Sequence, residues 1–381
     1  YQVSFGEAWV NILATADNHG RISSIPQLYD TVNLNSNKIF PDSGNKNVAN
    51  IFAIVGDPII NPLKKGFITE SNKTSGDVQF LFIENLIKFI KKVAQKGKND
   101  ANFETTYTPG NHCFDGGDKW LFNKLKTSEL TTILTNADMD SSPIFNTMTK
   151  EERQKFVASK VIDIPDDKNP DIVNKLLILG VTIPGTEFYT PGLVKDLKII
   201  NACGKKDIDI KEEDLRETFE TLNKVVSGFK KEHTNGAVLV QSHTGLAISS
   251  MIAQKVPGID VILNGHDHKD KEDIVNGVHI ISLAKDNELV KSLRLHFNDD
   301  GKLDPLPEDK PISKTFYTKN TKIKNNNPFL PLIYSTFKDD KKPLIRIVSS
   351  EDEFDRLDID GVRWQHNVLA NFVTSAILSS L

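Results

Sequence analysis

Cysteine is almost absent from this chain of 381 residues, which contains only Cys113 and Cys203. Two cysteines make no disulfide framework, and no CxxC pair indicates a structural zinc site. We therefore interpret both side chains as lone thiols. Cys113 is of further interest only because it directly follows His112.

Long apolar runs and an excess of one charge are also missing. No run approaches the roughly 20 apolar residues that a membrane-spanning helix requires, so we expect no membrane span. The formal net charge of -4 is spread along the chain, which argues against nucleic acid as a partner and leaves only a local basic patch open. A hydrophobic fraction of 38% and a charged fraction of 26% are typical of a globular protein. The length suits a single large α/β domain with an appendage.

Short β-type runs recur along the chain, and a polar cluster follows the C-terminal end of each. The runs are residues 10–14, 50–55, 105–108, 237–241 and 260–264, and the clusters after them contain Asp17/His19, Asp57, Asn111/His112, His243 and His266/His268. Strands with such near-continuous apolar character are typical of a sheet that is covered on both faces.

Helical patterns lie between these runs. From Phe82 to Ala94 the apolar residues fall on one stripe, and the segment from Glu212 repeats that spacing. The alternation of strands and helices predicts an α/β architecture with crossover connections. In such sheets a site collects at the carboxyl ends of the strands, where the polar clusters fall.

Each polar cluster alone is a weak signal, since Asp17-Asn18-His19 could be a turn and Gly56-Asp57 is a common loop sequence. Their succession is more specific, because packing gives no reason to place carboxylate and imidazole groups at five strand ends, where unpaired polar groups are costly to bury. Five of the nine histidines lie in these clusters. We interpret the other four as surface or strand histidines: His233, His279, His296 and His366.

Taken in order, the clusters resemble the calcineurin-like metallophosphoesterases and, within them, the 5′-nucleotidase branch. The family pattern is D-x-H, G-D, G-N-H, a later H and G-H-x-H. The chain carries it as Asp17-Asn18-His19, Gly56-Asp57, Gly110-Asn111-His112, His243 and Gly265-His266-Asp267-His268. The branch is indicated by His19-Gly20-Arg21, Asn111-His112-Cys113-Phe114-Asp115 and Val256-Pro257-Gly258-Ile259-Asp260. The resemblance extends over about residues 8–300.

The resemblance implies a four-layer αββα sandwich, in which two mixed sheets pack face to face and are flanked by helices. It also implies two divalent metal ions as cofactors. One ion would be held by Asp17, His19 and His268, the other by Asn111, His243 and His266, and Asp57 would bridge them. His112 would face the substrate phosphate, and Asp115 would orient it. Mixed nitrogen and oxygen ligands suit Mn, Zn, Fe or Ni better than Ca, and the identity of the metal stays open.

The implied function is a two-metal-dependent phosphoester hydrolase, a 5′-nucleotidase-like phosphomonoesterase or phosphodiesterase. A metal-activated hydroxide would attack phosphorus, and His112 with Asp115 would stabilise the transition state. We expect a small phosphoester as substrate, with nucleotides as the favoured class, and assign neither substrate-binding residues nor a protein partner. Two alternatives stay open: a catalytically idle relative that serves as a binding protein, and a hydrolase of another bond such as a sulfur ester.

The chain also departs from the family. Ala16, Cys113 and residues 58–61 differ from the residues usual there, although none of these changes removes an implied ligand. We predict a catalytic domain over residues 1–304, a linker or long excursion over 305–328, and a reduced C-terminal segment over 329–381, ending in a helical pattern. In this branch a larger second domain supplies aromatic side chains that stack on the base, and we expect that pocket not to be present in its usual form.

Location is suggested only by analogy. Members of this branch are often exported, and the first residue, Tyr1, is compatible with a removed signal peptide. We therefore expect a secreted or extracytoplasmic protein, with a cytoplasmic location still open.

Overall fold

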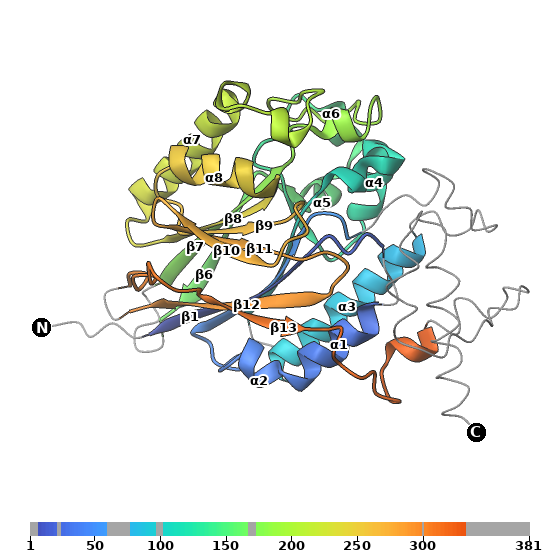
Figure 1. Cartoon of the computed structure of the whole chain (residues 1–381), viewed down its shortest axis with the longest axis vertical. Coiled ribbons are helices and arrows are strands. Elements are labelled where there is room, and N and C mark those ends of the chain that lie inside the picture. The colour runs from blue at the N-terminus through green and yellow to red at the C-terminus, as the bar shows by residue number, and fades with distance from the viewer. Residues whose placement is uncertain are drawn as a thin grey trace, which may run out of the picture.

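The fold has four layers, two mixed β-sheets packed face to face with helices on both outer faces (Figure 1). The structure is a computed structural model, and it describes residues 7–20, 24–58, 77–96, 102–166, 173–298 and 301–332. The predicted α/β four-layer sandwich is confirmed. The predicted helical pattern at 368–381, together with His366 and Arg21, lies outside the described residues.

The first sheet has seven strands in the order β13-β12-β1-β2-β3-β4-β5. Strands β1 to β5 pair in parallel, whereas β12 pairs antiparallel with both β1 and β13. Strand β13 falls inside residues 305–328, the stretch predicted as a linker or excursion. The strands are β1 (Ala8–Ala16), β2 (Val48–Val55), β3 (Asn102–Thr108), β4 (Thr131–Ile133), β5 (Phe156–Val157), β12 (Leu289–Phe297) and β13 (Ser313–Tyr317).

The second sheet has six strands in the order β10-β11-β9-β8-β7-β6. Its four central strands are parallel, and the two edge strands, β10 and β6, are antiparallel to their neighbours. The strands are β6 (Ser159–Pro165), β7 (Val173–Thr182), β8 (Ala237–His243), β9 (Val261–Asn264), β10 (Lys271–Val275) and β11 (Val278–Ser282).

Helices cover the outer face of each sheet. On the first sheet lie α1 and α3, and on the second lie α7 and α8 (Figure 1). The α-helices are α1 (Ile25–Leu34), α2 (Ser36–Ile39), α3 (Asp77–Gln95), α4 (Asp118–Leu125), α5 (Lys150–Arg153), α6 (Thr186–Tyr189), α7 (Arg216–Glu232) and α8 (Gly245–Lys255). The 3₁₀ helices are η2 (Asn111–Gly116), η3 (Pro143–Thr147), η4 (Asp207–Asp209) and η5 (Glu212–Leu215). Among the described helices, none combines the length and apolarity that crossing a membrane demands.

Three hydrophobic clusters fill the spaces between the four layers. In β1, Val10 and Ile12 face the second sheet, whereas Leu13 faces the helices. In β8, Leu239 faces the first sheet, and Val240 packs toward α7 and α8. Both faces of the central strands are therefore buried, which explains why these strands are apolar at nearly every position rather than at every second one.

The parallel register brings the polar clusters to one edge of the sandwich. Ala16 lies beside Val55, and Val55 lies beside Thr108, so β1, β2 and β3 end at the same level. In the second sheet Ser242 lies beside Asn264, so β8 and β9 end together as well. All five strands predicted to carry a polar cluster are present, and the loops after them meet at this edge.

Candidate metal centre

The backbone at this edge adopts conformations that L-amino acids rarely adopt. In the described part of the chain, eleven non-glycine residues have positive φ, and five of them belong to the predicted clusters. Such strain persists only where the surrounding structure enforces it, and it gathers at functional sites. The five cluster residues are Asp17 (φ 49), His19 (φ 51), Asp57 (φ 31), His266 (φ 86) and His268 (φ 58).

Glycines in the clusters make room for the buried ring of His243. At Gly56, which has φ 78, an added Cβ would lie 1.6 Å from Nδ1 of His243. At Gly110 it would lie 2.4 Å from Oδ1 of Asp57 and 2.6 Å from Nε2 of His243. The glycines of the G-D and G-N-H clusters therefore let backbone approach side chain where no other residue would fit.

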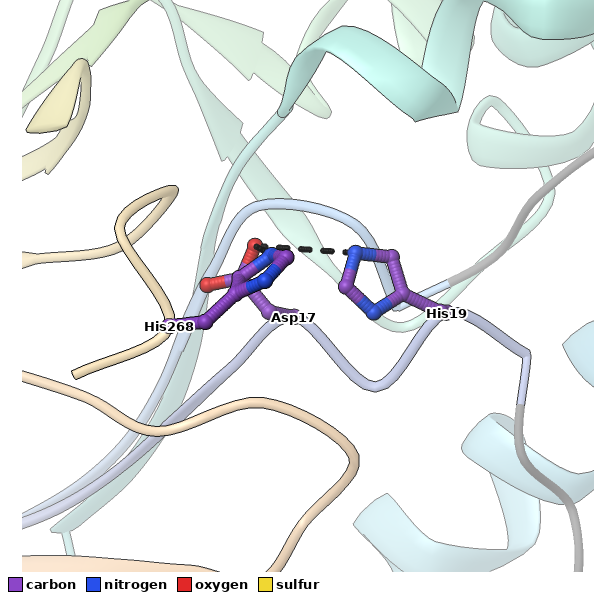
Figure 2. A group of neighbouring side chains, drawn as sticks. All are labelled: Asp17, His19 and His268. Carbon is purple, nitrogen blue, oxygen red and sulfur yellow. Dashed lines mark ion pairs between the residues drawn. The ribbon is translucent and has the colours of Figure 1, made fainter. Parts of the chain in front are cut away.

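Asp17 lies among three imidazoles. Its Oδ2 accepts a hydrogen bond from the backbone N–H of His266 at 3.0 Å. Its Oδ1 lies 3.4 Å from Nε2 of His268, 3.7 Å from Nε2 of His243 and 3.9 Å from Nε2 of His19. Figure 2 shows Asp17 with His19 and His268, its carboxylate directed toward the ring of His19.

Asp57 is held in a similar way. Its Oδ1 accepts hydrogen bonds from the backbone N–H and the thiol of Cys113, at 3.1 and 3.4 Å. Its Oδ2 lies 3.1 Å from Nε2 of His243. Among the described residues, neither this oxygen nor Oδ1 of Asp17 finds a hydrogen bond of ordinary geometry, although both are buried. Each aspartate thus has one oxygen fixed by the protein and a second aimed into the imidazole cluster.

Asn111 lies between His243 and His266. Its Oδ1 lies 3.3 Å from Nε2 of His243 and 3.0 Å from Nδ1 of His266. Nδ1 of His243 lies 3.2 Å from the carbonyl of Val55, to which it can donate, so Nε2 is the nitrogen that faces the carboxylates. The structure therefore brings together all seven residues predicted as metal ligands.

His112 and Asp115 form a pair at the rim of this cluster. Nδ1 of His112 lies 3.1 Å from Oδ2 of Asp115, within one turn of η2. The two aspartates of the site are buried, and two of its imidazoles, those of His112 and His268, are exposed.

The charges of these groups perturb one another strongly. Burial opposes protonation of His243, yet the charges of Asp57 and Asp17 raise its pKa to about 9. Burial opposes ionisation of Asp57 too, but the charge of His243 holds the pKa of Asp57 well below its usual range. Burial and the nearby charge of His243 lower the pKa of His266 to about 4. For His112, partial loss of contact with water opposes protonation, but the hydrogen bond to Asp115 and the charge of Asp57 outweigh this effect and raise the pKa.

The donor set fits a transition metal. Three groups of side chains place one ligand atom each within 4.8 Å of one another: Asp17/His19/His268, His19/Asp57/His112 and Asp17/Asp57/His243. Imidazole nitrogen together with carboxylate oxygen suits Mn, Fe, Zn or Ni. A cation would also compensate the two buried carboxylate oxygens that have no hydrogen bond of ordinary geometry among the described residues.

Several residues at the site carry no signal in the sequence. Asp286 lies 3.5 Å from Nδ1 of His19, and Tyr189 lies 3.3 Å from Nε2 of His266 and donates to Asp207. All three come from loops or short helices without a recognisable pattern. Asp267 occupies the variable position of G-H-x-H and accepts a hydrogen bond from a backbone N–H at the start of α8, so only its place in the motif could have revealed it.

Known proteins with similar sequence or structure share this architecture. The trifunctional nucleotide phosphoesterase YfkN of Bacillus subtilis is 23% identical over 336 residues, which cover 80% of this chain and 20% of YfkN. The chain thus spans about one fifth of the length of this curated relative. A crystal structure of the calcineurin-like phosphoesterase YfkN superposes with a TM-score of 0.55 and 16% identity, over 87% of this chain and 97% of the other.

Two further solved structures resemble the fold. A 5′-nucleotidase precursor from Thermus thermophilus gives a TM-score of 0.56 at 16% identity, covering 86% of this chain and 58% of the other. The sulfate thiohydrolase SoxB of Thermus thermophilus gives 0.54 at 12% identity, covering 86% and 60%. Fold likeness alone therefore does not separate phosphorus from sulfur chemistry. Residues 10–270, well over half of the chain, match the family model of the calcineurin-like phosphoesterases, and the chain belongs to that family.

Proposed function

We propose that the protein hydrolyses small phosphoesters with two divalent metal ions at the edge where the five strands end. Asp17, His19 and His268 would hold one ion and Asn111, His243 and His266 the other, with Asp57 between them. The observation that carries this proposal is the pair of buried carboxylate oxygens, Oδ1 of Asp17 and Oδ2 of Asp57, which face imidazole nitrogens and lack ordinary hydrogen bonds among the described residues.

The ligand geometry supports a shared site rather than two separate ones. His243 lies within 3.7 Å of both aspartates and within 3.3 Å of Asn111, so the two proposed ligand sets meet at one ring. Bound divalent ions would supply Lewis acidity and positive charge for an in-line displacement at phosphorus. The buried carboxylates and neutral imidazoles would fix the positions of these charges before the substrate arrives.

His112 is proposed to act on the substrate. Nδ1 of its ring lies 3.1 Å from Asp115, so Nε2 is the nitrogen that would be left to act on the substrate. Desolvation of the ring is outweighed by the hydrogen bond to Asp115 and the charge of Asp57, which raise the pKa of His112 and so favour its protonated form. From this position the ring would donate to a phosphoryl oxygen or to the leaving group.

Nucleotides are the substrate class that we propose. The support is the activity stated in the names of two relatives, a trifunctional nucleotide phosphoesterase and a 5′-nucleotidase precursor. The proposed preference for phosphoesters rests on the polar cluster of this chain. The proposed preference for nucleotides does not, because a nucleotide base would lie beyond that cluster.

The proposed catalytic unit is residues 1–304. Residues 305–328 would form an excursion that packs back onto it, since β13 pairs with β12 and Thr318 donates to the carbonyl of Asn287. We also propose that residues 329–381 form a separate C-terminal segment and that the protein is extracytoplasmic. For the location, the support is the word precursor in the name of the Thermus relative.

Hydrolysis of a panel of phosphoesters tests the proposal. The product measured would be inorganic phosphate from AMP, a nucleoside monophosphate from 2′,3′-cyclic AMP and UDP-glucose, and p-nitrophenol from bis(p-nitrophenyl) phosphate. AMP, 2′,3′-cyclic AMP, UDP-glucose and bis(p-nitrophenyl) phosphate would each be assayed with Mn, Zn, Ni or Mg, for wild type and Asp57→Asn. We expect metal-dependent turnover that Asp57→Asn abolishes, with a nucleotide as the best substrate. Silence across the panel from a protein that binds two ions would favour a binding protein instead.

A further inference from the structure

Two carboxylates outside the predicted clusters each approach an imidazole from its outer side. We propose that Asp286 and Asp207 are positioning residues for different metal positions. Asp286 would act on His19, and Asp207 together with Tyr189 would act on His266. The inference rests on the two-metal function proposed above, and it assigns each ion its own outer carboxylate.

Asp286 reaches His19 from the loop between β11 and β12. Its Oδ1 lies 3.5 Å from Nδ1 of His19, while Nε2 on the other side of the ring faces Oδ1 of Asp17 at 3.9 Å. The ring therefore spans two carboxylates and presents a different nitrogen to each. If Nδ1–H donates to Asp286, the lone pair of Nε2 is left for a metal.

The loop that carries Asp286 is fixed on several sides. The backbone N–H of Asp286 donates to the carbonyl of Asp17 at 2.7 Å, and its φ of 61 is a conformation that aspartate tolerates better than most residues. The next residue, Asn287, accepts a hydrogen bond from Thr15 at 2.8 Å and donates to Ser24 at 3.0 Å. The carboxylate is thus tied to the same strand end that carries Asp17.

Asp207 approaches His266 both directly, with its Oδ2 3.7 Å from Nε2 of the ring, and through Tyr189. The hydroxyl of Tyr189 donates to Asp207 and lies 3.3 Å from Nε2 of His266, and the two rings meet edge to face at 5.3 Å. Nδ1 of His266 lies 3.0 Å from Oδ1 of Asn111, on the inner side. His266 thus faces the cluster through Nδ1, whereas His19 and His243 face it through Nε2. An outer partner on Nε2 selects the tautomer that leaves Nδ1 free for a metal.

The two outer carboxylates come from separate segments, η4 and the loop before β12. Partners of this kind fix the tautomer and the orientation of a ligand ring, and their loss typically lowers metal affinity about 10- to 100-fold. Because the two segments are independent, loss of either carboxylate should weaken the binding of one ion and leave the binding of the other unchanged.

Calorimetric titration of the metal-free protein with Mn²⁺ tests this assignment. Wild type should bind two equivalents. In Asp286→Asn, and more strongly in Asp286→Ala, the affinity of one site should fall about 10- to 100-fold. Asp207→Asn and Tyr189→Phe should each weaken the other site. Asp163→Asn, which removes a surface carboxylate paired with Lys175, serves as the matched control and should change neither affinity.

Combining variants separates positioning from a merely structural role. In a His19→Ala background, Asp286→Asn should have no further effect on metal affinity, whereas Asp207→Asn should keep its full effect. If the residues only supported the fold, the variants would lower the melting temperature of the metal-free protein and leave both affinities intact. That result, with two ions bound to wild type, would overturn this inference alone. Fewer than two ions bound to wild type would contradict the proposed function, and the inference would fall with it.

Discussion

Metal binding at this site should weaken as the pH falls, because His243 must lose a proton before Nε2 can accept a metal. The charges of Asp57 and Asp17 overcome burial and raise the pKa of His243 to about 9. A proton that competes with the metal lowers the apparent affinity about tenfold for each pH unit below that pKa. At pH 7 the expected penalty is therefore about 100-fold, or about 2.7 kcal/mol, relative to the deprotonated ring.

Calorimetry in buffers of different ionisation enthalpy measures the released proton directly. Between about pH 7 and 8.5 we expect the affinity for Mn²⁺ to rise about tenfold per pH unit, with release of about one proton per protein. His266, with a pKa of about 4, is already neutral in this range and should release none. A constant affinity over this range, without proton release, would refute the reasoning.

The same ion pairs should give the metal-free protein an unusual dependence of stability on pH. A histidine whose pKa rises on folding stabilises the fold fully below its unfolded pKa, and this stabilisation is lost as the pH rises through the folded value. For His243 the window runs from its ordinary value of 6.5 to about 9, and the loss is of the order of 3 kcal/mol. Thermal unfolding in the presence of a chelator should therefore give a higher melting temperature at the acid end. A melting temperature that increases across this window would contradict the assigned pairing.

Three further outcomes follow from the geometry. His112→Ala should slow turnover about 100- to 10,000-fold while metal content, measured by elemental analysis, stays at the wild-type level; loss of metal would mean that His112 is a ligand. Gly110→Ala should lose metal, since its Cβ would lie 2.4 Å from Oδ1 of Asp57, whereas Gly204→Ala, with no heavy atom within 4 Å of the new Cβ, should behave as wild type in the same measurement. Removal of metal by a chelator should abolish phosphoester hydrolysis, and added Mn²⁺ should restore it; turnover that survives metal removal would exclude metal-dependent hydrolysis.

The layers of the fold could be predicted because the residue pattern of each strand reflects how it is buried. The runs at 50–55 and 237–241 are apolar at nearly every position, which only a sheet buried on both faces requires. The pairing of β12 with β1, by contrast, joins residues almost 300 positions apart and depends on packing that no local pattern encodes. Strand β13 was hidden because it is a polar edge strand in a stretch rich in Pro, Lys and Asn.

The candidate site divides in the same way. Its seven proposed ligands lie in short motifs at strand ends, so the order of these motifs and their resemblance to a known family were enough to predict them, and the structure brings them together. Asp286, Tyr189 and Asp207 contact the same imidazoles but come from segments chosen by the fold, not by a motif. The glycines are part of the sequence motifs, but the sequence does not show why they are needed. The structure shows that a side chain at Gly56 would collide with the ring of His243.

The central claim is that two metal ions act together in phosphoester hydrolysis, and a stoichiometric titration tests it most directly. Metal-free protein at a concentration well above the metal dissociation constants would receive Mn²⁺ in known equivalents while hydrolysis of the best substrate is followed. We expect full turnover only after two equivalents, and none at any stoichiometry for Asp57→Asn. Full turnover at one equivalent, or turnover in Asp57→Asn equal to wild type, would contradict the account.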